Sequence, residues 1–258
     1  MKITLIGAGN LATSLALALK KANHEILQVY SRTEESARAL AQKLSLEAYT
    51  TDLAAINSDS DIYIVALTDN ALTQLAPTLS QGRTSALWLH TAGSIPMDTF
   101  TCERRGVMYP MQTFSKERIV DFSNIPVFIE ASRPEDVSIV KDLAYSITKT
   151  VIELSSNERK YLHLAAVFCC NFPNHFATIA SQILQEHNIP FSVMLPLIDE
   201  TIGKLHNMQP RQAQTGPAVR RDQKVMQAHI DILIREQHPE LAHIYNIISK
   251  SIQDYDQL

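Results

Sequence analysis

Two glycines near the start of the chain could bring its backbone close to a phosphate group. Gly7 and Gly9 follow the apolar run 3–6 and precede a segment with helical periodicity, and Ala12 completes a G-x-G-x-x-A pattern. Residues without a Cβ let a chain turn sharply out of a strand, and the N–H groups of the next helix then point at the anion. A tight turn without a ligand is the alternative. The motif predicts a dinucleotide site that includes Gly7, Ala8, Gly9, Asn10 and Leu11.

The end of the second apolar run indicates which dinucleotide is bound. Ser31, Arg32 and Thr33 follow the β-rich run 25–30, where an NAD-type fold places an Asp or Glu for the ribose 2′-hydroxyl. Two hydroxyls and a guanidinium suit a 2′-phosphate instead, through charge-assisted hydrogen bonds. We therefore expect NADP as the cofactor; the alternative is that Arg32 is a solvated surface residue.

Polar side chains on a long helix, expected from residue 157 to about 186, could supply a proton. His163 and Cys170 fall within ~20° of each other on a helical projection, and Asn171 lies ~80° from His163. If this stripe faces a nicotinamide, His163 could protonate the oxygen of a carbonyl or the nitrogen of an imine while the hydride is transferred to the carbon. The alternative is an interior histidine whose hydrogen bonds are all satisfied.

Further candidates stand at the ends of other predicted strands. His90 ends the apolar run 85–90, where a donor could touch the nicotinamide or the substrate, although it could simply bind a neighbouring loop. Tyr109 and Gln112 follow the strand 106–110 and could reach the same cleft as substrate contacts. The remaining histidines lack ligand spacing, so we expect no metal.

The elements that must position these residues alternate between strand and helix up to residue 154. This order predicts an α/β Rossmann domain with a doubly wound, mainly parallel sheet over residues 1–154. Ligands of such sheets bind outside the carboxyl ends of the strands. Leu67, Thr68, Asp69 and Thr91 stand at these ends, and we assign them to the cofactor site.

Residues 155–258 show helical periods and no strand signal, which predicts an all-α C-terminal domain. Apolar residues cover more than one side of the long helix, so we expect it to be buried, plausibly in a homodimer formed through the C-terminal helices. Pro173 removes a helical hydrogen bond and predicts a kink.

Composition excludes several classes of protein. The 258 residues carry a net charge of −4, so neither nucleic acid nor an anionic membrane surface is expected as a partner. No segment approaches the ~18 apolar residues of a membrane span, and the first apolar run is too short for a signal peptide. Three cysteines without metal or redox spacing fit a reduced cytoplasm.

These features together resemble a superfamily of NADP-linked reductases that includes pyrroline-5-carboxylate reductase and 6-phosphogluconate dehydrogenase. The segments 90–94, 109–115 and 215–222 look like a bacterial branch known only as Rossmann-like NADP oxidoreductases. In such reductases a loop similar to Thr215, Gly216 and Pro217 reaches the active site, and Arg220 could meet a substrate carboxylate. The alternatives are a helix start and a surface charge.

One departure from this superfamily affects the expected chemistry. Its hydroxyacid dehydrogenases carry a catalytic Lys followed four residues later by Asn, whereas Lys160 is followed at that spacing by Leu164. The leading hypothesis is an NADP(H)-dependent oxidoreductase that transfers a hydride to or from a small carbonyl or imine substrate. The alternatives are a non-catalytic NADP-binding sensor or scaffold and a deazaflavin-linked NADP reductase.

Overall fold

The protein is described by a computed structural model that covers residues 1–115 and 118–254. Its contacts divide the chain into two compact units, Met1–His175 and Phe176–Leu258. We expected a division after residue 154, where the last strand ends. The contacts group the first turns of the long helix with the sheet, because these turns pack on it through Arg159 and Glu130.

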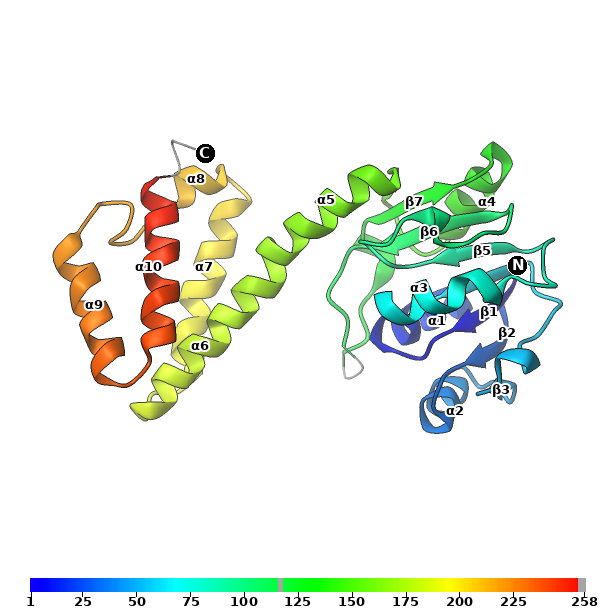
Figure 1. Cartoon of the computed structure of the whole chain (residues 1–258), viewed down its shortest axis with the longest axis horizontal. Coiled ribbons are helices and arrows are strands. Elements are labelled where there is room, and N and C mark those ends of the chain that lie inside the picture. The colour runs from blue at the N-terminus through cyan, green and yellow to red at the C-terminus, as the bar shows by residue number, and fades with distance from the viewer. Residues whose placement is uncertain (116–117, 255–258) are drawn as a thin grey trace. The chain divides into compact units, whose positions relative to one another are not determined.

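The first unit is an eight-stranded sheet with helices on both faces, shown in Figure 1. The strand order is β3-β2-β1-β4-β5-β6-β7-β8, and the β6–β7 pair is antiparallel while the other pairs are parallel. This confirms the doubly wound, mainly parallel sheet. The strands are β1 (Lys2–Ile6), β2 (Glu25–Tyr30), β3 (Tyr49–Thr50), β4 (Ile62–Val65), β5 (Leu87–His90), β6 (Arg105–Pro110), β7 (Val127–Ala131) and β8 (Val151–Glu153).

Helices connect these strands and continue into the second unit. The long helix contains a π-helical turn, Val167–Asn171, which ends two residues before Pro173. Pro173 has no N–H to donate to the Cys169 carbonyl, and the Phe172 N–H bonds instead to the Val167 carbonyl, so the irregularity expected at this proline is a π turn. The helices of the first unit are α1 (Asn10–Lys21), α2 (Glu34–Lys43), α3 (Asp69–Leu79), α4 (Pro134–Tyr145) and α5 (Ser156–Ala166).

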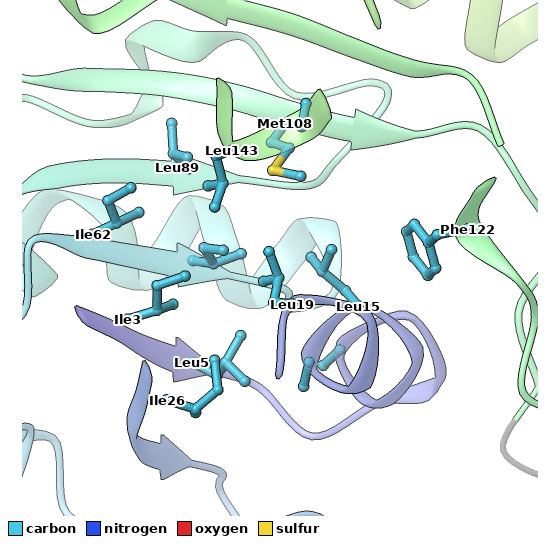
Figure 2. Packing of buried hydrophobic residues seen from close by; sticks show 14 of the residues in the cluster. Ile3, Leu5, Leu15, Leu19, Ile26, Ile62, Leu89, Met108, Phe122 and Leu143 are labelled. Carbon is cyan, nitrogen blue, oxygen red and sulfur yellow. The ribbon is translucent and has the colours of Figure 1, made fainter. Parts of the chain in front are cut away.

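Alternating side chains of the strands pack on opposite faces of the sheet. Ile62 and Ile64 belong to one core cluster, with α1 and α4, whereas Tyr63 and Val65 belong to a second cluster, with α3. This period of two is what a strand buried on both faces requires. Figure 2 shows the first cluster, in which Leu15 and Leu19 of α1 lie against the strands.

The second unit is helical and exposes many apolar side chains. Leu197 is 63% exposed and Ile234 is 53% exposed, and among the described residues of this unit only a few apolar ones are buried. No helix in residues 1–115 and 118–254 is long and apolar enough to cross a membrane. The helices of this unit are α6 (Phe172–Glu186), which begins just before the division, α7 (Leu195–Leu205), α8 (Pro210–Ala213), α9 (Gln223–Arg235) and α10 (Pro239–Gln253).

Candidate active site

The carboxyl ends of β1, β2 and β4 form a cleft of about 340 Å³. Because β1 lies between β2 and β4, the segments that follow these three strands meet at one edge of the sheet. Eight of the residues predicted to bind the cofactor line this cleft. They are Gly7, Ala8, Gly9, Ser31, Arg32, Thr33, Leu67 and Thr68.

The two glycines of the motif have different structural reasons to lack a Cβ. Gly7 has a φ of +118°, and a Cβ there would lie 2.2 Å from the Ala66 carbonyl oxygen, so the turn out of β1 requires glycine. A Cβ on Gly9 would meet no atom within 4 Å, so its absence keeps open space in front of α1. The residues fit a dinucleotide at this point, because α1 has no acidic residue in its first turn and no described side chain caps its free N–H groups.

The end of the cleft that follows β2 is lined by hydroxyl groups and one guanidinium. Ser31, Thr33 and Ser36 line it together with the exposed Arg32, and none of the described residues that line the cleft is acidic. Two carboxylates follow in the first turn of α2, Glu34 and Glu35, and Glu34 is paired with Arg38 on the surface. The donor set therefore suits an anionic group at this end.

The other four predicted cofactor residues do not line the cleft, and two of them brace its rim. Asn10 donates its side-chain amide to the Phe114 carbonyl, 2.9 Å away, which holds the loop after β6 against the start of α1. Asp69, the first residue of α3, accepts a hydrogen bond from the Ser94 hydroxyl. Leu11 is half-buried in α1, and Thr91 is buried after β5.

A tyrosine–histidine pair lies two strands further along the same sheet edge. The Tyr109 hydroxyl and His163 Nδ1 are 3.1 Å apart, and their rings meet edge to face. Gly93 packs against both, since a Cβ on it would lie 2.6 Å from His163 Nδ1 and 2.9 Å from Tyr109 Cζ. Ser94, which binds Asp69 at the cofactor cleft, is the next residue, so the pair and the cleft share one loop.

The register of α5 against the sheet explains why these two side chains meet. Tyr109 faces the same side of the sheet as Glu130, because Glu130 pairs with Val107 across the β6–β7 ladder. Arg159 of α5 binds Glu130 at 2.8 Å. His163 follows Arg159 by one helical turn, about 6 Å, and Tyr109 follows Val107 by two strand residues, about 6.6 Å. The matched steps bring the two functional groups together.

Burial raises the pKa of Tyr109, so its hydroxyl carries a proton at neutral pH. The side chain is only 8% exposed, the Arg159 charge acts in the opposite direction, and Cys170 raises the pKa slightly further. Tyr109 can therefore donate a proton to a reacting group or receive one through His163, which is half-buried. The sequence predicted a proton-transfer role for His163 and a substrate contact for Tyr109, and the structure places the two functional groups in contact.

His90 is placed inside the protein and not at the cleft. Its side chain is fully buried, its ring contacts Phe100, and its Nδ1 accepts a hydrogen bond from the Ala92 N–H at 3.2 Å. Burial, with a contribution from the nearby Arg159 charge, lowers its pKa to about 3, against a smaller effect of the Pro96 backbone. The imidazole is therefore neutral with its proton on Nε2, and we do not assign the expected proton transfer to it.

The remaining predicted residues are spread over three places. Gln112 lies after β6 and lines a small pocket of about 280 Å³ with the residues that follow it. Asn171 is exposed in the π turn. Thr215 and Pro217 line an apolar pocket of about 340 Å³ within the second unit, Gly216 between them has a φ of +109°, and Arg220 is exposed.

Sequence reasoning missed three residues that shape the site. Gly93 was given no role of its own, although its position three residues after the strand end at His90, within the segment 90–94, was a usable signal. Arg159 precedes His163 by four residues and so shares its helix face, which could have marked it. Glu130 gave only a weak signal, as a carboxylate at the end of an apolar strand. Within the described residues, no group of three or more His, Cys, Asp or Glu could hold a metal ion.

A glycine turn before α1, a cleft at the carboxyl ends of a doubly wound sheet, and a following helical unit define a Rossmann-type dinucleotide-binding protein. Family comparisons agree: residues 2–87 match a family described as NADP oxidoreductase coenzyme F420-dependent, and residues 125–252 match a domain of unknown function. No curated protein matches this sequence at a significant level.

Solved structures extend the likeness over the whole chain. A Bacteroides fragilis protein described as a "putative NADP oxidoreductase" is 51% identical, with a TM-score of 0.93 and 98% of each chain covered. A Thermotoga maritima protein is 22% identical, with a TM-score of 0.78 over 99% of this chain and 100% of the other. An imine reductase of Myxococcus stipitatus in complex with NADP⁺ shares the fold at 15% identity, with a TM-score of 0.70 over 98% and 94% of the two chains.

The chain therefore belongs to the family of Rossmann-like NADP oxidoreductases that the Bacteroides protein represents. The family is described as one of NADP-linked oxidoreductases, and the cleft at β1, β2 and β4 is the candidate site for a nicotinamide cofactor.

Proposed function

We propose that this protein is an NADP(H)-dependent oxidoreductase that acts on a small carbonyl or imine substrate, with Tyr109 and His163 as its proton-transfer pair. The observation that carries the proposal is the 3.1 Å contact between the Tyr109 hydroxyl and His163 Nδ1. Both rings pack against Gly93, and the next residue, Ser94, donates to Asp69 at the start of α3. When bound, the reduced nicotinamide supplies a hydride to an electron-poor carbon. The protein then has to orient both reactants and deliver one proton.

The residues divide this work between them. The N–H groups at the start of α1, behind Gly7 and Gly9, hold the diphosphate, and Arg32 with its neighbouring hydroxyls holds the 2′-phosphate. Tyr109 donates its phenolic proton to the carbonyl oxygen or imine nitrogen as negative charge develops there. His163 can return a proton to the phenolate and hold the hydroxyl in place.

Binding and turnover test this proposal separately. NADPH and NADH are titrated by fluorescence and by thermal stabilisation, and NADPH oxidation is then followed against a panel of keto acids, cyclic imines and a deazaflavin. We expect NADPH to bind more tightly than NADH. We expect Tyr109→Phe and His163→Ala to lower turnover while the NADPH dissociation constant stays unchanged. Absence of cofactor binding at millimolar NADPH contradicts the proposal.

A deazaflavin-linked NADP reductase is the second candidate. It is favoured by the family match to residues 2–87, whose description names a deazaflavin coenzyme. That match ends before β6 and α5, which carry the proton-transfer pair, so it bears on the nucleotide half only. Oxidation of NADPH by the deazaflavin alone supports this candidate. Binding without any turnover supports a sensor or scaffold.

We further propose that the protein works as a homodimer in the cytoplasm, with the helical unit forming the interface. Leu197, Ile234 and Ile247 are each more than half exposed, and a second copy of the chain would cover such surfaces. The cysteines of the described chain are all free, as a reducing compartment requires. Light scattering after size exclusion should give twice the mass of one chain, and Leu197→Asp should shift it towards the monomer.

A further inference from the structure

Arg159 is a buried guanidinium with no direct contact to the cofactor cleft. Its side chain is 1% exposed, yet it carries a full charge in the first turns of α5. Nη1 donates to Glu130 Oε2 at 2.8 Å, and Nη2 donates to the Ile95 carbonyl at 2.6 Å and to Ser156 Oγ at 3.2 Å. A buried charge is tolerated when it is paired and hydrogen-bonded, and both Nη atoms of Arg159 meet this condition, whereas its Nε has no partner among the described residues.

Ser156 closes the same network. Its hydroxyl donates to Glu130 Oε2 at 2.5 Å and accepts the Met97 N–H at 2.9 Å. The end of β7, the start of α5 and the loop after β5 are therefore held at one point. Figure 1 shows α5 starting beside β7, where this junction lies.

Both sides of the proton-transfer pair depend on this junction. His163 is one turn beyond Arg159 on α5, so a shift of the helix start moves the imidazole. Gly93, which packs against His163 and Tyr109, is two residues before Ile95 in the loop that Arg159 binds. Moving either segment opens or blocks the space in which the two rings meet.

We propose that Arg159 is a positioning residue, which sets the contact between Tyr109 and His163 by fixing α5 and the loop after β5 to Glu130. This inference rests on the proposed function for its catalytic meaning, but the contact itself can be measured without a substrate. The guanidinium also acts electrostatically: it lowers the pKa of Tyr109 against the effect of burial, and it helps to keep His90 uncharged. The other groups that face Tyr109 are His163 and Cys170.

The test compares Arg159→Met and Arg159→Lys in the full-length protein. Tyrosine and histidine labelled with ¹³C report the pKa of Tyr109 and the proximity of the two rings by NMR. In Arg159→Met we expect a higher pKa of Tyr109, because the positive charge is gone, and loss of the ring contact. In Arg159→Lys we expect the pKa of Tyr109 to stay close to the wild-type value, because the positive charge is kept. We expect the ring contact to be lost, because a lysine ammonium cannot reach both the Glu130 carboxylate and the Ile95 carbonyl as the guanidinium does. NADPH affinity should change less than twofold in both variants.

Two further variants separate positioning from general instability. The double variant Arg159→Met, Glu130→Gln removes both charges of the ion pair. It avoids the unpaired carboxylate that Arg159→Met leaves at Glu130, so a loss of the ring contact in the double variant cannot be attributed to that charge. Arg104→Met is the matched control, because Arg104 also binds a buried carboxylate, that of Asp136, at 2.6 Å. This ion pair lies just before the start of β6, whereas Tyr109 lies near the end of that strand. It should leave the Tyr109 pKa and the ring contact as in the wild type.

The outcomes are distinct for the two proposals. An unchanged ring contact in Arg159→Met, a contact restored in full by lysine, or the same loss in Arg104→Met overturns the positioning role. With an identified substrate, kcat of Arg159→Met should fall by about 10²-fold at unchanged KM for NADPH, as misplacement by about 1 Å predicts. If wild-type protein binds no NADPH, the proposed function fails, and the NMR result on Arg159 still stands by itself.

Discussion

Substitution of Gly93 by alanine should separate the two members of the proton-transfer pair. The new Cβ would lie 2.6 Å from His163 Nδ1, 2.8 Å from its Cγ and 2.9 Å from Tyr109 Cζ. Carbon contacts of this kind relax to about 3.5 Å, so the two rings must withdraw by roughly 1 Å. Overpacking in a close-packed interior costs ~1–3 kcal/mol, and we expect a loss of this size in the free energy of unfolding.

The same displacement should lower turnover much more than stability. A misplacement of about 1 Å costs on the order of 10²-fold in rate, whereas the cofactor cleft is lined by other residues and should bind NADPH as before. Urea unfolding gives the free energy, fluorescence titration gives the NADPH dissociation constant, and ring contacts in the NMR spectrum report the geometry of the pair.

Gly203 in α7 provides the control, because a Cβ there would meet no atom within 4 Å. Gly203→Ala should leave turnover unchanged and raise the free energy of unfolding by up to ~1 kcal/mol, as alanine favours the helix. If Gly93→Ala keeps wild-type stability and the Tyr109–His163 contact, the close packing at this loop is refuted, and with it the reasoning that Gly93 shapes the site.

Three further results are expected. Gly7→Ala should destabilise the whole fold, because its Cβ would clash with the Ala66 carbonyl, whereas Gly9→Ala should unfold like the wild type and lose NADPH affinity; equal stabilities in urea would contradict this. Arg32→Ala should weaken NADPH by about 10- to 100-fold and leave NADH almost unchanged, since a charged hydrogen bond contributes ~1.5–3 kcal/mol; parallel titrations decide it. Burial lowers the pKa of His90 from its ordinary value of 6.5 to about 3 in the folded protein. Between these two pH values only the unfolded chain binds the proton, so the contribution of His90 to the free energy of unfolding falls by ~1.4 kcal/mol for each pH unit as the pH falls. His90→Asn should remove this part of the pH dependence, measured by urea unfolding between pH 5 and 7.

The sequence by itself was sufficient for the nucleotide half of the molecule. The turn at Gly7 and Gly9 was predictable because a strand, a positive φ and an open helix start are local requirements that few residue types meet. Strands that alternate with helices and consist of continuous apolar runs, as in residues 62–65, indicated the doubly wound sheet, because a strand covered on both faces leaves no polar side.

Two features of the candidate site depended on the tertiary structure. His90 and His163 were both candidate proton donors in the sequence, one at the end of a predicted strand and the other on a predicted helix. Phe100 and the segments around it cover His90, and such burial depends on residues that are distant in sequence. The antiparallel direction of β7 also had no local signal, and it is this direction that puts Glu130 at the level of Val107.

The local requirements of a phosphate-binding turn are encoded in neighbouring residues, so the sequence alone predicted a dinucleotide site and the strands that border it. The proton-transfer pair joins residues 54 positions apart. Its geometry comes from the register of α5 on the sheet, which the buried Arg159–Glu130 ion pair fixes across 29 positions. Packing between distant segments decided which histidine faces Tyr109, because burial and register are properties of the assembled sheet and helix.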